Sequence, residues 1–226
     1  MAVDTHASAE LPAAGARTAR GARGPLLLAA VLVLAMAVLW ILAELVPYVR
    51  AHDALLLARA TSLQDERTGS LARGLLSTLE VPYALLWGAA IVAVALTRGR
   101  PRLAVAAAAI MILSPVTADL IKPILAHAHD RAGATRVGAA SWPSGHATAS
   151  MALVCALALA VPRGARPAVL AAGSIYVLAV AAALLLLAWH MPSDVLGGWL
   201  LAGVWTALAV AALRAANNRR PERRVW

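Results

Sequence analysis

The sequence predicts an all-α membrane protein, a bundle of six transmembrane helices, on three observations. Hydrophobic residues make up 62% of the 226-residue chain and charged residues only 14%, whereas soluble domains are about half apolar and about a quarter charged. The apolar residues gather in runs nearly free of charge, each close to the roughly 20 residues that a helix needs to cross a bilayer. The basic residues lie mainly between these runs and in the tails. This pattern excludes an ordinary soluble enzyme.

The expected spans follow one another from residue 25 to residue 213. They are 25–49, 81–97, 103–122, 147–162, 167–189 and 194–213. Residues 1–24 are rich in Ala, Gly and Arg without apolar periodicity, so we expect a disordered cytoplasmic tail there, and 214–226 form a basic cytoplasmic tail. A cleaved signal peptide is the alternative reading of the first run. That run is about twice as long as the apolar region of a signal peptide, which favours a retained span.

The segment 50–80, between the first two spans, is polar and has nearly balanced charge. Some of its leucines recur at helical spacing. We therefore expect one or two short helices that lie along the membrane interface.

The positions of the basic residues predict the orientation of the bundle. Thirteen of the 20 Lys and Arg residues fall in the two tails and in the short loops 98–102 and 163–166. Because short basic segments stay on the cytoplasmic side, both termini are expected to be cytoplasmic. The segments 50–80, 123–146 and 190–193 then face outward.

The net charge of +9 does not indicate a nucleic-acid partner. No run combines basic residues with aromatic platforms, as single-strand binding would need. The one cysteine, Cys155, lies inside an apolar run and is interpreted as a small core residue rather than a reactive thiol.

Five of the six histidines fall on the predicted outer side: His52, His127, His129, His146 and His190. His190 ends the fifth span, and Asp194 opens the sixth. A carboxylate four residues on can accept a hydrogen bond from Nδ1, which fixes the tautomer and leaves Nε2 as a directed nucleophile. The alternative is that Asp194 only caps the last helix, and the two roles are compatible.

Two further groups on the outer side suit an anion. The run Pro143-Ser144-Gly145-His146 precedes the fourth span, where a helix N-terminus presents backbone N–H groups and a hydroxyl. Lys122 ends the third span, where an ammonium needs a counter-ion or a phosphate. Asp119 lies three residues earlier on the same helical face, so a structural ion pair is the alternative interpretation of Lys122.

These residues, in this order, resemble the type 2 phosphatidic acid phosphatases, also called lipid phosphate phosphatases, whose fold is related to the vanadium haloperoxidases. The family pattern is Lys, six residues, Arg-Pro; then Pro-Ser-Gly-His; then Ser-Arg, five residues, His, three residues, Asp. The resemblance covers about residues 81–213. The second part matches in full at 143–146, and the end of the third part matches as His190 and Asp194.

The resemblance implies a role for each matching residue. His190 would attack phosphorus to form a phosphohistidine, and Asp194 would orient it. His146 would protonate the leaving alkoxide and then activate water. Lys122, Ser144 and Gly145 would hold the phosphoryl oxygens. The resemblance implies no metal ion and no other cofactor, which suits phosphoryl transfer by positioning and charge stabilisation.

The chain departs from the family pattern at both arginines. His129 and Asp130 stand where the family has Arg-Pro, and Ala183 and Leu184 stand where it has Ser-Arg. A bidentate guanidinium contact to phosphate is among the stronger charge-assisted interactions. His129 and Arg131 are candidate substitutes for the first arginine, with Arg136 five residues beyond Arg131, and nothing near Leu184 replaces the second.

The sequence thus predicts a multi-pass membrane enzyme that hydrolyses a lipid phosphate or diphosphate at the outer face of the plasma or inner membrane. Its partners would be membrane lipids, and its substrate phosphatidic acid, an isoprenoid phosphate or diphosphate, or a related monoester. Two alternatives stay open. One is a relative that binds lipid phosphate without catalysis, which the missing arginines favour. The other is a transporter, although the last three expected spans carry no charge in their interiors.

Overall fold

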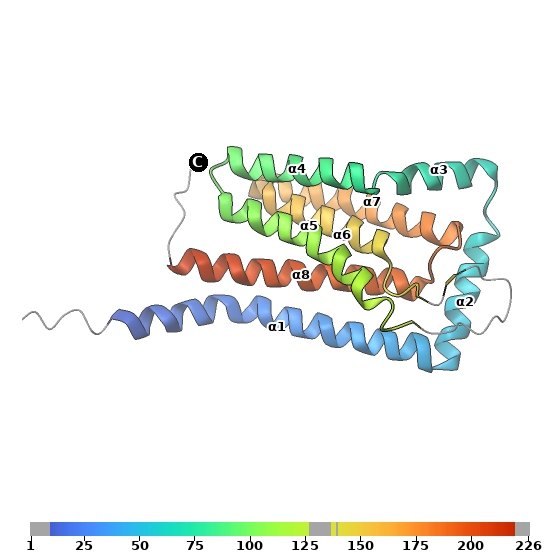
Figure 1. Cartoon of the computed structure of the whole chain (residues 1–226), viewed down its shortest axis with the longest axis horizontal. Helices are drawn as coiled ribbons and strands as arrows, with labels where there is room; N and C mark the ends of the chain where they lie inside the picture. The colour runs from blue at the N-terminus through green and yellow to red at the C-terminus, as the bar shows by residue number, and fades with distance from the viewer. Residues whose placement is uncertain (1–9, 127–136, 139, 220–226) are drawn as a thin grey trace, which may run out of the picture.

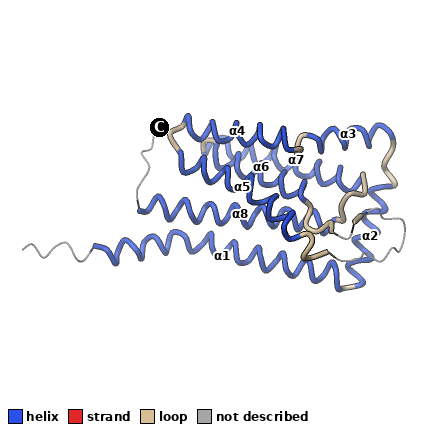
Figure 2. The backbone as a smooth tube through the Cα atoms, viewed as in Figure 1, coloured by secondary structure: helices blue, strands red, loops and turns tan. Residues whose placement is uncertain are grey.

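Long helices aligned along one axis form the body of the chain, and one helix crosses the end of this bundle (Figure 1). The computed structural model describes residues 10–126, 137–138 and 140–219, with only the backbone for 10–21. Figure 2 shows helices joined by short loops, and no strand within the described residues. The helices along the axis are α1 (Glu10–Leu45), α4 (Val81–Thr97), α5 (Pro101–Ile121), α6 (Gly145–Ala160), α7 (Arg166–Leu186) and α8 (Pro192–Arg219).

The bounds of α4, α5, α6 and α7 lie within three residues of four of the expected spans. The first and last helices differ more. α1 begins at Glu10, so residues 10–24 are helical rather than the irregular tail expected, as suits the helix-forming Ala and Arg of this stretch. α1 also ends at Leu45 rather than at residue 49, because the residue before a proline is driven out of the α region and Val46, ahead of Pro47, is extended. α8 continues to Arg219, into the expected C-terminal tail.

Length and composition alone identify fewer spans than the six expected. Among the described residues, four helical stretches are long and apolar enough to cross a membrane, namely Ala22–Leu45, Pro101–Ile121, Arg163–Leu186 and Pro192–Asn218. The last three correspond to α5, to α7 with the 3₁₀ turn η1 (Arg163–Ala165), and to α8. The pair α3–α4, bent by 50°, makes a fifth if it counts as one span, and α6 is shorter. The chain is therefore an all-α, multi-pass membrane protein with four to five apolar spans.

Two short helices make up the segment between the first two expected spans. α2 (Pro47–Thr61) crosses the bundle end (Figure 1), and α3 (Glu66–Ser77) meets α4 at the 50° bend and packs on α7. Asp65 starts α3 with a capping box: its Oδ1 accepts from the Thr68 N–H at 2.6 Å, and the Asp65 N–H donates to Thr68 Oγ1 at 2.9 Å.

The helix at the centre of the bundle, α6, buries small side chains. α6 packs against α4, α5, α7 and α8, and its buried residues are all small: Ala147, Thr148, Ser150, Ala152, Val154, Ala156, Ala158 and Ala160. Small residues let helix backbones approach closely, which drives association inside a bilayer. Cys155 lies half-buried on the same helix.

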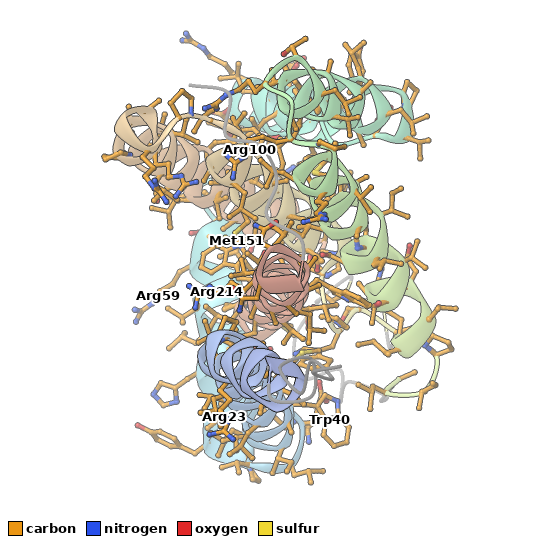
Figure 3. All side chains as sticks on the ribbon, turned by 90° about the vertical axis from the view of Figure 1, so that its left-hand side faces the viewer. Arg23, Trp40, Arg59, Arg100, Met151 and Arg214 are labelled. Carbon is orange, nitrogen blue, oxygen red and sulfur yellow. The ribbon has the colours of Figure 1, made fainter. Side chains whose placement is uncertain are left out.

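The two ends of the bundle differ in charge. Figure 3 views the molecule from the end where α1 begins and α8 ends, and this end carries Arg23, Arg100 and Arg214. The basic turns 98–102 and 163–166 lie at the same end. α5 and α7 end, and α6 and α8 begin, at the opposite end of the bundle, where α2 lies (Figure 1). The expected functional residues are at these helix ends.

Candidate active site

A tight turn between α7 and α8 carries His190. The Trp189 N–H donates to the carbonyl of Leu184 at 3.0 Å and the Ala188 N–H to that of Leu185 at 3.0 Å, a Schellman pattern that ends α7. Ala188 has a φ of 53°, the left-handed conformation that such a turn requires and that glycine usually supplies. The turn reverses the chain and brings His190 directly before α8.

The carboxylate of Asp194 closes this turn. Its Oδ2 lies 3.2 Å from His190 Nδ1 and accepts from the Met191 N–H at 2.9 Å. Asp194 has no exposed surface, and its Oδ1 has no hydrogen-bond partner among the described residues. A buried carboxylate on Nδ1 favours the tautomer in which Nε2 carries the lone pair. His190 itself is partly buried.

The Pro-Ser-Gly-His run is hydrogen-bonded directly to the start of α8. The Ser144 N–H donates to the Asp194 carbonyl at 2.9 Å, and Ser144 Oγ caps α6 by accepting from the Ala147 N–H at 3.3 Å. Two glycines of α8 allow this contact. A Cβ on Gly198 would lie 2.6 Å from the Ser144 carbonyl, and one on Gly197 would lie 2.8 Å from the Trp142 ring. Only residues without a side chain permit so close an approach.

Lys122 reaches the N-terminus of α6 from the end of α5. Its Nζ lies 3.4 Å from the position that a Cβ on Gly145 would take, and it donates to Asp119 Oδ1 at 2.8 Å. The ammonium and the first N–H groups of α6 therefore share one small region, where an anion is electrostatically favoured. The Lys122–Asp119 pair that the sequence offered as an alternative is present as well.

His146, which precedes the apolar run 147–162, faces the same region. Burial lowers its pKa first, and the nearby His190 and Lys122 lower it further, while Glu80 and Asp119 oppose that shift. The ring of His146 also lies 5.8 Å, between centroids, from the ring of Trp189. His146, His190 and Lys122 are therefore close enough to influence one another electrostatically.

The sequence did not predict several residues of this region. Glu80 lies between α3 and α4 and acts on His146, and Asp53 on α2 accepts hydrogen bonds from Ser193. Their partners lie 66 and 140 residues further along the chain, so no local spacing could reveal them. The pair Gly197-Gly198 offered a weak signal, because adjacent glycines inside an apolar helix suggest close packing.

The candidate substitutes for the first arginine of the family pattern lie on a segment that the structure does not describe. His129 and Arg131, as well as His127 and Arg136, lie outside the described residues. Leu184 is fully buried in an apolar cluster with Ala72 and Leu76 of α3 and with Leu79, which follows α3. Among the described residues no group of three His, Cys, Asp or Glu side chains is placed to hold a metal ion.

The arrangement defines a class of protein: a membrane-embedded helical bundle with two histidines, a lysine and a capped helix N-terminus gathered at one end. Residues 83–218 match the PAP2 superfamily. This match covers more than half of the chain, and the protein therefore belongs to the PAP2 superfamily of membrane phosphatases. A search of curated proteins found no match.

A crystal structure shares this fold. It is described as the first transmembrane PAP2-type phosphatidylglycerolphosphate phosphatase, from Bacillus subtilis. The superposition has a TM-score of 0.64 and covers 87% of this chain and 98% of the other, at 18% sequence identity. The similarity confirms the all-α polytopic fold, and at this identity it says nothing about the substrate.

Proposed function

We propose that this protein hydrolyses a lipid phosphate or diphosphate through a phosphohistidine on His190. The observation that supports this most is the 3.2 Å contact of His190 Nδ1 with the buried Asp194 carboxylate, next to His146 and Lys122. A histidine that only ended a helix would need no buried carboxylate, and binding alone would need no oriented nucleophile.

In the first step, Nε2 of His190 attacks phosphorus, and the P–O bond to the lipid alcohol breaks in a monophosphate or the bridging P–O bond breaks in a diphosphate. Asp194 holds the Nδ1 proton and stabilises the positive charge that develops on the ring. Protonated His146 donates its proton to the leaving alkoxide. The products of this step are a neutral lipid alcohol, or a lipid monophosphate from a diphosphate, and a phosphoryl group bonded to His190.

In the second step, neutral His146 takes a proton from water as that water attacks phosphorus. The P–N bond breaks, inorganic phosphate leaves and Nε2 regains its lone pair. Both steps use only side chains of this chain and water. The equatorial oxygens, where charge develops in phosphoryl transfer, would lie against Lys122 Nζ and the first N–H groups of α6, with Ser144 and Gly145 forming that helix start.

We propose that the family's two phosphate-binding arginines are absent from this protein. Leu184, at the expected place of the second one, is enclosed by apolar side chains of α3. The cationic contacts to phosphate would then come from Lys122, with Arg131 and His129 as further candidates. Such a site holds phosphate less tightly than one with bidentate guanidinium contacts.

Apolar side chains beside Lys122 support a lipid as the substrate. Leu120 and Ile124 flank Lys122 and are 65% and 77% exposed, and Trp189 beside His146 is 44% exposed. These surfaces suit an amphiphile whose phosphate enters the site while its tail stays in the membrane. Tryptophan also favours the interface between headgroups and acyl chains.

We also propose that the site faces the outside of the plasma or inner membrane. The basic turns and the helix ends that carry Arg23 and Arg214 lie at the opposite end of the bundle, and positively charged segments stay in the cytoplasm.

A protein that binds lipid phosphate without hydrolysing it is the second candidate. The apolar surroundings of Leu184 favour it, because a family member without guanidinium contacts stabilises the transition state less. A substrate panel that includes phosphatidic acid, phosphatidylglycerol phosphate and an isoprenoid monophosphate and diphosphate distinguishes the two.

The test is phosphate release by the purified full-length protein in detergent micelles, beside two histidine variants. His190→Ala removes the nucleophile and should reduce kcat by at least about a thousandfold. His52→Ala is the matched control, since His52 lies on α2 at the same end, is exposed and contacts only Tyr48 among its described ring and hydrogen-bond partners. This control should keep wild-type activity.

Phosphate-labelled enzyme quenched in alkaline detergent should carry a phosphoryl group that later acid treatment removes and that His190→Ala lacks. Equal phosphate release by wild type and His190→Ala would exclude the proposed nucleophile. Lipid phosphate binding with no release on the whole panel, between pH 5 and pH 8, would establish the second candidate instead.

A further inference from the structure

The helix that crosses the bundle end is tied to the turn that carries the proposed nucleophile. α2 lies across the end of the bundle near the start of α8 (Figure 1), and its Asp53 contacts the first turn of α8. The Asp53 carboxylate accepts from Ser193 Oγ at 2.5 Å and from the Ser193 N–H at 3.1 Å. Ser193 stands directly between Pro192 and Asp194, so this contact is made inside the segment that joins His190 to its carboxylate partner.

Asp53 supplies a hydrogen-bond acceptor that the start of α8 lacks within the helix. The first N–H groups of a helix have no partner within the helix, and they favour a negative charge. The Ser193 N–H is one of these groups, and Ser193 is only 5% exposed, so without Asp53 it would be left unpaired away from water. A buried donor without a partner destabilises the conformation that contains it. Asp53 therefore acts as a helix cap supplied by another helix.

An apolar contact strengthens the same connection. Leu57 lies one turn after Asp53, on the same face of α2, and packs in a buried cluster with Met191 and Val137. The Met191 N–H in turn donates to Asp194 Oδ2 at 2.9 Å. α2 thus contacts residues on both sides of Pro192, and the Asp194 carboxylate, which orients His190, sits within the framework that these contacts hold.

We propose that Asp53 is a positioning residue for His190. Through Ser193 it fixes the first turn of α8, and with it the distance between the Asp194 carboxylate and His190 Nδ1. Asp53 touches neither the substrate nor the reacting atoms. This inference rests on the proposed function, and it assigns α2 a role in keeping the nucleophile aligned.

The role predicts a specific pattern of kinetic change. Asp53→Ala removes both acceptors from Ser193, and small misplacements of reacting groups cost up to about a hundredfold in rate. We expect kcat to fall roughly tenfold or more while KM stays within about twofold, since Lys122 and the start of α6 hold the phosphate from another side. Asp53→Asn keeps a carbonyl oxygen at the same place and should restore most of kcat.

Ser193→Ala tests the contact from its other side, and it serves where Asp53→Ala fails to fold. It removes the 2.5 Å bond but keeps the backbone one, so its loss of kcat should be smaller than that of Asp53→Ala. The double variant should be no worse than Asp53→Ala alone, because residues that act through one contact are not additive. His52→Ala, one residue away on α2, is the matched control.

A second measurement makes the outcome independent of turnover. The ring ¹⁵N chemical shifts of His190 report its tautomer and hydrogen bond, and they should change in Asp53→Ala and return in Asp53→Asn. Unchanged kcat and unchanged shifts in Asp53→Ala would overturn the inference, as would a loss of kcat that Asp53→Asn fails to restore. If the wild type releases no phosphate, the proposed function fails, and the His190 shifts alone decide whether Asp53 positions that ring.

Discussion

Two contacts between helices at the site end of the bundle differ in chemistry, and we call them the polar joint and the apolar joint. The polar joint links α6 to α8 through the Ser144 N–H, which donates to the Asp194 carbonyl at 2.9 Å, and through the close approach of Ser144 and Thr148 to Gly198. The apolar joint packs α7 against α3 and the turn after it. Its buried residues are Val180, Ala183 and Leu184 on α7, Ala72 and Leu76 on α3, and Leu79 in the turn. His190 lies on the segment between them.

The difference teaches where phosphate chemistry can take place in this protein. The polar joint offers a helix N-terminus, Lys122 and two histidines, which are groups that stabilise an anion. The apolar joint offers no polar side chain at Leu184, where the family pattern places an arginine. The two joints therefore differ in what they offer an anion: polar groups stand where α6 meets α8, and hydrocarbon surrounds Leu184.

The largest expected effect comes from removing the charge at the centre of the polar joint. In Asp194→Asn, the side-chain amide can donate to Nδ1 and favour the wrong tautomer of His190. We expect kcat for phosphate release to fall by about 10³–10⁴-fold, with the thermal midpoint in detergent measured alongside to show that the variant is folded. A folded variant with kcat within tenfold of wild type would mean that Asp194 serves only as a structural residue.

The next effect tests the apolar joint. Leu184→Arg would bury a guanidinium among apolar side chains with no partner, which should lower the free energy of unfolding by on the order of 3 kcal/mol. Leu184→Met conserves volume and should cost less than about 1.5 kcal/mol. A Leu184→Arg variant that is stable and has a lower KM than wild type would show that an arginine here reaches the phosphate after all.

A smaller effect compares a glycine of the polar joint with an exposed glycine on α3. Gly198→Ala puts a Cβ 2.6 Å from the Ser144 carbonyl, so we expect a loss of about 1–3 kcal/mol in unfolding free energy. Gly74→Ala on α3 meets nothing within 4 Å, and alanine is a better helix former by up to about 1 kcal/mol. The thermal midpoint in detergent should therefore fall in Gly198→Ala and rise in Gly74→Ala. Equal shifts in the two variants would contradict the close contact at Ser144.

The smallest effect is a change in pH dependence. Glu80 raises the pKa of His146, against the lowering by burial, His190 and Lys122. Glu80→Gln removes that charge, so the pKa of His146 falls and the protonated acid is lost at a lower pH. The alkaline limb of the kcat/KM profile should shift to lower pH, while Glu66→Gln, at the far end of α3, should leave it in place. A shift to higher pH would contradict the assignment of His146 as the proton donor.

Much of the fold could be predicted from the sequence because a bilayer imposes a strong and local constraint. An apolar run of about 20 residues has few stable arrangements other than a spanning helix, and four helices begin and end close to the expected residues. The exceptions have local causes as well. Pro47 ends α1 early, and helix-forming residues extend α1 and α8 beyond the apolar runs. α4 and α6 are as short as the runs 81–97 and 147–162 from which they were expected, with 17 and 16 residues.

Part of the candidate site was predictable for the same reason. His190 and Asp194 are four residues apart across a turn, so their contact follows from local geometry, and Ser144 caps the helix that begins beside it. Contacts that join distant segments were out of reach. Asp53 contacts Ser193, and Glu80 affects the pKa of His146, only because α2 packs against α7 and α8 and α3 packs against α7.

The sequence by itself determined the membrane class, the positions of most helices and the His190–Asp194 pair, since each depends on residues within a few turns of one another. Only the tertiary structure decided that Lys122 lies beside Gly145, that Leu184 is sealed against α3 and that α2 caps α8. Those contacts depend on how helix faces pack, and side-chain size and hydrogen bonding between segments far apart in the chain select that packing.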